Sequence, residues 1–167
     1  MGLFRKSNDE SKFPVLKQVG FLQQLSGHER ALFSHSLDRR DFRDGEWVFH
    51  QGFPQAVLFI VATGEVEIVL ESAATQPAVL DTLGPASFFG ETGLFIETQR
   101  TAGVRAKGNA TLLAISQEDF NHFVQLNPRA GIKLLYGLGR RLSEMLARTN
   151  DRLLELGRET ADGQPTG

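Results

Sequence analysis

The chain has 167 residues, with 18 Lys and Arg against 20 Asp and Glu, and a net charge of −2 at pH 7. This balance does not predict binding to nucleic acid or to an anionic membrane. The absence of Cys excludes disulfides, thiolate metal sites and a Cys nucleophile. The longest apolar run, Ala56 to Ala62, is too short to span a bilayer, and the N-terminus lacks the apolar segment of a signal peptide. We therefore expect one cytoplasmic domain without membrane association.

The N-terminal part of the chain is predicted to be helical after a flexible start. Residues 1–13 are polar and charged, and we expect them to be flexible. Residues 14–25 form an apolar lead-in that is either helical or irregular. The sequence Ser26-Gly27-His28-Glu29 is a capping box, which predicts a helix from there to about Leu37. One face of this helix would carry Ala31, Leu32 and His35.

The middle of the chain consists of short apolar segments separated by turn residues. The alternation from Glu65 to Glu71 is typical of a half-buried strand, and the run from Val57 to Val61 of a buried one. Asp44-Gly45 predicts a hairpin, and Thr63-Gly64 and Lys107-Gly108-Asn109 predict further turns. Many short strands with regular turns favour a β-sandwich or β-roll. We predict strands at residues 40–43, 46–51, 57–61, 65–71, 78–83, 103–106 and 110–115.

Two helices are predicted after the strands. Ser116 is suited to cap a short helix to about Leu126, and Pro128 to begin a second helix. The second helix would run to about Leu156, roughly 43 Å, and end at Gly157. The predicted divisions are therefore a flexible N-terminus at residues 1–13, a β-roll with flanking helices at 14–126, a long helix at 127–156 and a disordered tail at 157–167.

A stripe of mostly leucine residues along the long helix has the alternating spacing of a coiled-coil seam. We expect it to make a homodimer, because the last turns of the helix extend past a body of this size. The alternative is that the stripe packs on the β-roll alone. The stripe consists of Leu135, Gly139, Leu142, Leu146, Thr149, Leu153 and Leu156.

The stretch from Leu83 to Ala102 has the residues needed to hold a small anion that carries a sugar. Gly90 allows close approach of the backbone, and a helical turn beginning at Glu91 would direct free N–H groups at a phosphate. Arg100 would add a charge-assisted hydrogen bond and Thr101 a hydroxyl group. An ionised Glu91 would accept hydrogen bonds from the sugar, and it could also pair with Arg100.

The order Leu83-Gly84-Pro85, Phe88-Phe89-Gly90-Glu91 and Arg100-Thr101-Ala102 resembles the phosphate-binding cassette of cyclic nucleotide-binding domains. This family includes the bacterial catabolite activator, regulatory subunits of cyclic-AMP-dependent kinase and nucleotide-gated channels. The resemblance covers roughly residues 15 to 156. It implies a mainly β fold, a jelly-roll-like double-stranded β-helix, with an N-terminal helix and a long C-terminal helix.

The resemblance also implies a function. The protein would be a cyclic nucleotide sensor and not an enzyme, with cyclic AMP or cyclic GMP as its ligand and no metal or other cofactor. It would signal through the C-terminal helix and a protein partner. The purine would lie against Ile68 and Leu83. The ligand-binding residues that it implies are Phe89, Gly90, Glu91, Thr92, Gly93, Arg100, Thr101, Ala102, Ile68 and Leu83.

The choice between the two purines stays open. Met145 and Leu146 occupy the positions where the bacterial activator has hydroxyl residues that reach adenine, so one reason for cyclic AMP selectivity is missing. Thr101 has a hydroxyl that could bond the guanine amino group of a syn base. We therefore expect both nucleotides to bind, with a small preference of undetermined sign.

Three alternatives remain beside the sensor. A transcription factor of this family needs a helix-turn-helix, but few residues follow Leu156, so we expect no direct DNA binding. The sequence is then either a complete single-domain protein, which we favour, or a fragment. A metal-dependent cupin enzyme needs clustered ligands, whereas the histidines are scattered. A scaffold that has lost its ligand is disfavoured by the presence of both Glu91 and Arg100. The scattered histidines are His28, His35, His50 and His122.

Overall fold

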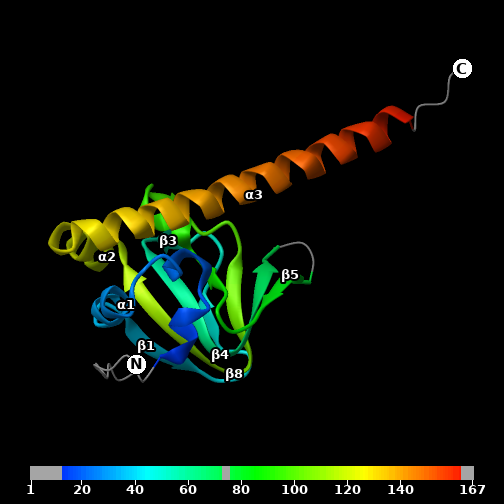
Figure 1. The fold of residues 1–167 in the computed structure, drawn as a ribbon. Coiled ribbons are helices and arrows are strands. Elements are labelled where there is room, and N and C mark those ends of the chain that lie inside the picture. Colours follow the sequence, from blue (N-terminus) through cyan, green and yellow to red (C-terminus); the bar gives the residue numbers. More distant parts are fainter. Residues whose placement is uncertain (1–12, 73–75, 163–167) are drawn as a thin grey trace, which may run out of the picture.

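The computed structural model describes residues 13–72 and 76–162. It has an antiparallel β core with helices along one side, and one long helix passes over the core (Figure 1). The main sheet has the order β1-β8-β4-β5, with β2 also paired to β8 and β6 to β4, and β3 pairs with β7 separately. The strands are β1 Asp38–Phe42, β2 Trp47–Phe49, β3 Pro54–Gln55, β4 Val57–Leu70, β5 Ala78–Leu83, β6 Phe88–Phe89, β7 Thr98–Gln99 and β8 Gly103–Ser116. The helices are the 3-10 turns η2 Pro14–Lys17, η3 Gly20–Leu22 and η4 Glu91–Leu94, and the α-helices α1 Gly27–Ser34, α2 Gln117–Leu126 and α3 Pro128–Asp162.

The long strands β4 and β8 pair with each other from Val57↔Ser116 to Val69↔Gly103. The turns predicted at Thr63-Gly64 and Lys107-Gly108-Asn109 are wrong, because both strands continue through these positions. Gly64 has φ +76°, and a Cβ there would collide with the carbonyl oxygen of Asn109. The pairing register shifts beside it, between Val61 and Glu65. Glycine here makes a bulge that bends a continuous ribbon, and a bulge interrupts the sequence pattern in the same way as a turn.

The hairpin predicted at Asp44-Gly45 is also wrong, although the turn itself exists. Gly45 has φ +74°, and the Glu46 N–H donates to the Arg43 carbonyl at 3.0 Å. The flanking strands β1 and β2 do not pair with each other, because each pairs with a different part of β8. The long strand β8 therefore pairs with both β1 and β2. A local turn signal does not reveal this pairing.

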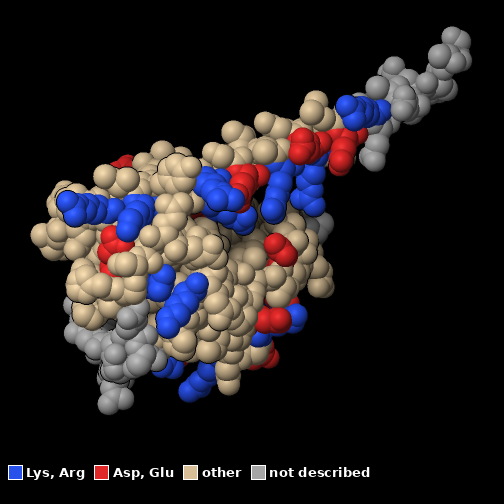
Figure 2. Space-filling model, in the orientation of Figure 1, with Lys and Arg blue, Asp and Glu red and all other residues tan. Residues whose placement is uncertain are grey.

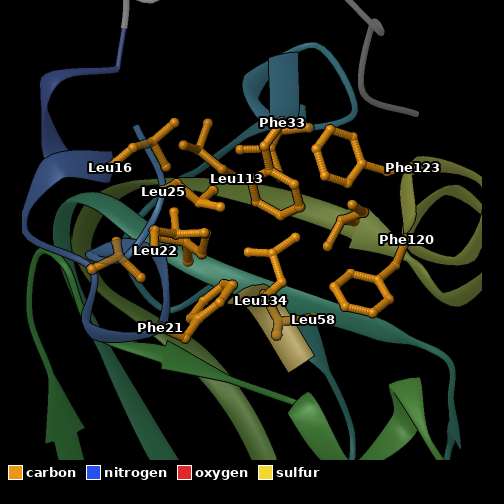
Figure 3. Packing of buried hydrophobic residues seen from close by; sticks show 14 of the residues in the cluster. Leu16, Phe21, Leu22, Leu25, Phe33, Leu58, Leu113, Phe120, Phe123 and Leu134 are labelled. Atoms are coloured by element: carbon orange, nitrogen blue, oxygen red, sulfur yellow. The ribbon is translucent and has the colours of Figure 1, made fainter. Parts of the chain in front are cut away.

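Two apolar clusters lie on opposite faces of β4. Leu58 and Ile60 belong to the cluster under the helices, whereas Phe59 and Val61 belong to the cluster inside the roll. Successive side chains of a strand point to opposite faces, so this part of β4 is buried on both sides and reads as an unbroken apolar run. Figure 3 shows the first cluster between the sheet and the helices. Its labelled members are Leu16, Phe21, Leu22, Leu25, Phe33, Leu58, Leu113, Phe120, Phe123 and Leu134.

The helix α1 begins with the predicted capping box. The Ser26 hydroxyl accepts from the Glu29 N–H at 3.2 Å, and the Glu29 carboxylate accepts from the Ser26 N–H at 2.7 Å. The helix ends at Ser34, before the predicted end, and its buried apolar residue is Phe33. Of the face predicted from Ala31, Leu32 and His35, Leu32 packs against the cluster under the helices, whereas His35 follows the last helical residue and is exposed. An ion pair between Glu29 and Lys133 at 2.8 Å joins α1 to α3.

The helices α2 and α3 begin where the caps predict. The Ser116 hydroxyl accepts from the Asp119 N–H at 3.0 Å, and Pro128 is the first residue of α3. Gly157 does not end α3, which continues to Asp162. A single glycine costs a helix interior only about 1 kcal/mol relative to Ala, so it does not force an end. Among the described residues, no helix is both long and apolar enough to cross a membrane.

The two ends of the long helix have different surroundings. Near its start, Leu134 and Leu138 are fully buried against the body, whereas the second half extends away from it (Figure 1). Basic and acidic side chains are mixed along this extension (Figure 2). Residues 163–167 of the predicted tail and residues 1–12 of the predicted flexible N-terminus lie outside the described residues, whereas residues 157–162 of the predicted tail continue α3. Phe13, the last residue of that N-terminal segment, is buried.

Candidate functional site

A cavity of about 300 Å³ opens between the β-roll and the underside of α3. Its volume is at the lower end of the range of roughly 300–1,000 Å³ for small-molecule sites. It brings together eight of the ten residues predicted from the sequence, but neither Leu83 nor Gly93 lines it. The predicted residues that line it are Ile68, Phe89, Gly90, Glu91, Thr92, Arg100, Thr101 and Ala102. The remaining lining residues are Phe49, Thr98, Val104 and Met145.

The predicted helical turn after Gly90 is present as the 3-10 turn η4. Gly90 itself has φ +83°, a left-handed conformation that favours glycine. A Cβ at this position would lie 2.5 Å from Nη1 of Arg100 and 2.6 Å from the Val57 carbonyl oxygen. The missing side chain therefore makes room for the guanidinium, a role that the sequence alone did not indicate.

Arg100 is the most unusual residue of the cavity. Only 6% of it is exposed, and its Nη2 donates to the Val57 carbonyl at 2.9 Å. Its Nε–H is buried and has no hydrogen-bond partner among the described residues. Burial lowers the pKa of the guanidinium to about 10, an effect that the negative charge of Glu91 partly opposes. At neutral pH the cavity therefore contains a buried positive charge that forms no ion pair with the described residues.

Glu91 is the other buried charged residue of the cavity, with 7% of it exposed. The expected pairing of Glu91 with Arg100 is not formed, because Arg100 makes no ion pair within the described part of the chain. Both side chains line one cavity without forming an ion pair with each other. Such an arrangement leaves an acceptor and a donor for other groups.

The cavity also has apolar lining residues, and one of them belongs to α3. Ile68 and Val104 come from the sheet, and Met145 comes from the long helix, with 39% of it exposed. The sequence pointed to both Met145 and Leu146 near a base, but Leu146 is 62% exposed and does not line the cavity. Successive helix residues differ by 100° in direction, so only one of the pair faces inward.

The predicted residues that miss the cavity have identifiable positions. Leu83 ends β5, where it pairs with Val66 and packs against the cluster inside the roll. Gly93 is buried within η4. Of the residues that sequence reasoning missed, Phe49 and Val104 are partners across β2 and β8. Nothing in the local sequence relates Phe49 to the cavity, because the pairing of distant strands brings it there.

Histidine does not contribute to this cavity. His50 contacts the Glu71 carboxylate at 2.9 Å outside the lining. Hydrogen bonds from the Gln51 N–H and from His50 lower the pKa of Glu71. Within residues 13–72 and 76–162, no group of three or more His, Asp and Glu side chains is arranged to hold a metal ion.

Comparison with known proteins identifies a family. Residues 39–127 match the family described as the cyclic nucleotide-binding domain. The cyclic AMP receptor protein of Thermus thermophilus is 34% identical over 120 residues, which cover 72% of this chain and 56% of that protein. The chain thus spans just over half of this curated relative.

Solved structures agree on the fold. The catabolite activator protein of Thermus thermophilus matches with a TM-score of 0.75 and 28% identity, over 83% of this chain and 63% of that one. A cyclic nucleotide-binding domain from Methylobacillus flagellatus matches with a TM-score of 0.76 and 16% identity, over 92% of this chain and 88% of that one. The predicted fold, a jelly-roll-like β-roll with an N-terminal and a long C-terminal helix, is confirmed.

Proposed function

Because the chain belongs to the cyclic nucleotide-binding domain family, we propose that it is a regulatory sensor that binds cyclic AMP or cyclic GMP in the cavity beneath α3. The relatives include cyclic-AMP-activated transcriptional regulators and a cyclic-AMP-dependent protein kinase regulatory subunit, and these names support the ligand class. We also propose a route by which this chain signals, through the long helix α3.

The observation that carries the proposal is the state of Arg100. A buried guanidinium with an unpartnered Nε–H and a lowered pKa is costly to maintain. A phosphate in the cavity would supply the missing acceptor and an opposite charge, in a short charge-assisted hydrogen bond. We therefore assign the anionic group of the ligand to a position beside Arg100 and η4, with Thr101 adding a hydroxyl.

The remaining groups of a cyclic nucleotide also find matching chemistry. We assign the ribose hydroxyl to Glu91, which lines the same cavity and accepts hydrogen bonds when ionised. We assign the purine to the apolar lining residues Ile68, Val104 and Met145. Leu83 is then a support of the sheet and not a direct contact, and Gly93 supports η4 in the same way.

The output is proposed to pass through α3. Met145 covers the cavity while the far half of the same helix leaves the body, so one rigid element reaches both the ligand and the solvent. The exposed leucines of its stripe, with Leu146 and Leu153 each 62% exposed, would form a homodimer seam or meet a protein partner. We also propose that the protein is cytoplasmic and that it catalyses no reaction.

Isothermal titration calorimetry tests the proposal. The parent is titrated with cyclic AMP, cyclic GMP and cyclic di-GMP, and with adenosine as a ligand that lacks the phosphate. We expect saturable binding of at least one of the two mononucleotides and much weaker binding of adenosine. Folded protein that binds neither cyclic AMP nor cyclic GMP at millimolar concentration would refute the proposed function.

A further inference from the structure

The side chain of Arg100 has few polar contacts for a buried cation. Its hydrogen bond to the Val57 carbonyl holds one end of the guanidinium, and the bare backbone at Gly90 gives space for the other. A broad contact comes instead from an aromatic ring, because the guanidinium carbon lies 3.9 Å from the centre of the Phe49 ring. The ring of Phe59 is farther away, at 5.9 Å.

The ring of Phe49 is itself fixed by its surroundings. Phe49 belongs to β2 and pairs with Val104 of β8. Its ring centre lies 5.8 Å from that of Phe59 and 6.0 Å from that of Phe89. These two rings stack on each other at 5.4 Å with an interplanar angle of 16°. Arg100 therefore lies on a rigid aromatic support built from three strands.

An aromatic support has a chemical consequence that a carboxylate would not have. The face of a ring attracts a cation through its quadrupole, most strongly when water is excluded. It uses none of the N–H donors of the guanidinium and adds no negative charge beside it. The Nε–H of Arg100 thus keeps no hydrogen-bond partner among the described residues, and the group stays cationic, as binding of an anion requires.

We propose that Phe49 is a positioning residue, which orients the Arg100 guanidinium by cation–π stacking so that its free N–H groups face the phosphate of the ligand. This inference rests on the proposed cyclic nucleotide function and adds the residue that sets phosphate affinity through Arg100. Phe49 contacts the guanidinium of Arg100 and does not contact the phosphate, so it affects phosphate binding only through Arg100.

The test compares Phe49→Leu, which removes the ring, with Phe49→Tyr, which keeps it. A matched control is Phe42→Leu, because Phe42 also packs against the cluster inside the roll but, among the described residues, makes no cation–π contact with Arg100. Calorimetry with whichever mononucleotide the parent binds should show a loss of about 2- to 30-fold for Phe49→Leu. Phe49→Tyr and Phe42→Leu should stay within about twofold of the parent, a change of about 0.4 kcal/mol.

Two further readouts separate positioning from a general structural role. Affinity for adenosine should be the same in Phe49→Leu and the parent, since adenosine has no phosphate. In the ligand-free parent, the NMR signal of the Arg100 Nε–H should show a ring-current shift, which Phe49→Leu strongly reduces and Phe49→Tyr preserves. The spectroscopic readout needs no bound nucleotide.

The outcomes distinguish the two hypotheses. If the parent binds no cyclic nucleotide, the proposed function fails and this inference fails with it. If the parent binds and Phe49→Leu binds equally well, the positioning role alone is refuted. Equal losses for adenosine and the nucleotide would also refute it, because Phe49 would then act only as a wall of the cavity. Absence of the ring-current shift in the parent would refute the stacking itself.

Discussion

Replacing Arg100 by Met should separate ligand affinity from stability. Met keeps the approximate length of the side chain and removes its charge and donors. The bound phosphate would lose a charge-assisted interaction in a buried site. We expect a loss of about 2–4 kcal/mol in binding free energy, which is roughly 30- to 1000-fold in affinity.

The stability of the ligand-free protein should change much less. Burial lowers the pKa of Arg100 from 12.5 to about 10, so folding disfavours the charged form by roughly 3 kcal/mol at one pKa unit per 1.36 kcal/mol. Below pH 10 the group is protonated in both the folded and unfolded states, and this cost is constant there. Met removes the cost but leaves the Val57 carbonyl without its donor, which costs about 1–3 kcal/mol. The two effects offset, and we expect a net change within about 2 kcal/mol.

Chemical unfolding and calorimetry on the same samples measure both quantities. Arg140→Met is the matched control, since the side chain of Arg140 is 72% exposed and pairs with Glu144 on the helix surface. The control should bind and unfold like the parent. Unchanged affinity in Arg100→Met, with the fold intact by circular dichroism, would refute the phosphate role. A stability loss well above 3 kcal/mol would instead make Arg100 a structural residue.

Three further predictions concern other parts of the molecule. The double variant Leu146→Asp with Leu153→Asp should sediment as a monomer and the parent as a dimer, because charges in an apolar seam are costly. A monomeric parent at micromolar concentration would contradict the seam. Thr101→Ala should weaken cyclic GMP more than cyclic AMP by about 0.5–1.5 kcal/mol in competition with a fluorescent nucleotide, and equal losses would assign Thr101 to the phosphate alone. The pKa of Glu29 is lowered from 4.5 to about 2, chiefly by its hydrogen bond with Lys133, so the pair stabilises the fold above pH 4.5 and this contribution is lost as the pH falls toward 2. Lys133→Met should therefore cost about 1 kcal/mol at pH 7 in urea unfolding, since the Lys133 side chain is more than a third exposed. The cost should be much smaller near pH 2, where Glu29 is about half protonated, and a cost that does not depend on pH would contradict this.

The local signals of the sequence were sufficient for several elements. The capping box at Ser26, the cap at Ser116 and the proline that begins α3 act within a single turn of chain, and the structure contains all of them. The cassette from Gly90 to Thr101 is nearly contiguous, so most of the cavity lining was also predictable. Short-range chemistry of this kind is encoded in neighbouring residues.

Pairing between distant strands was decided only by the tertiary structure. Gly64 lies in a bulge and not in a turn, because β4 and β8 continue together on both sides of it. Phe49 reaches the cavity through its pairing with β8. Arg100 donates to the Val57 carbonyl instead of pairing with Glu91, and this depends on how the fold places the three residues. Composition and local pattern show which residues carry charge, hydroxyl groups and apolar surface. The fold determined which of them meet, since contacts between residues far apart in the chain depend on the register of the whole sheet and not on local pattern.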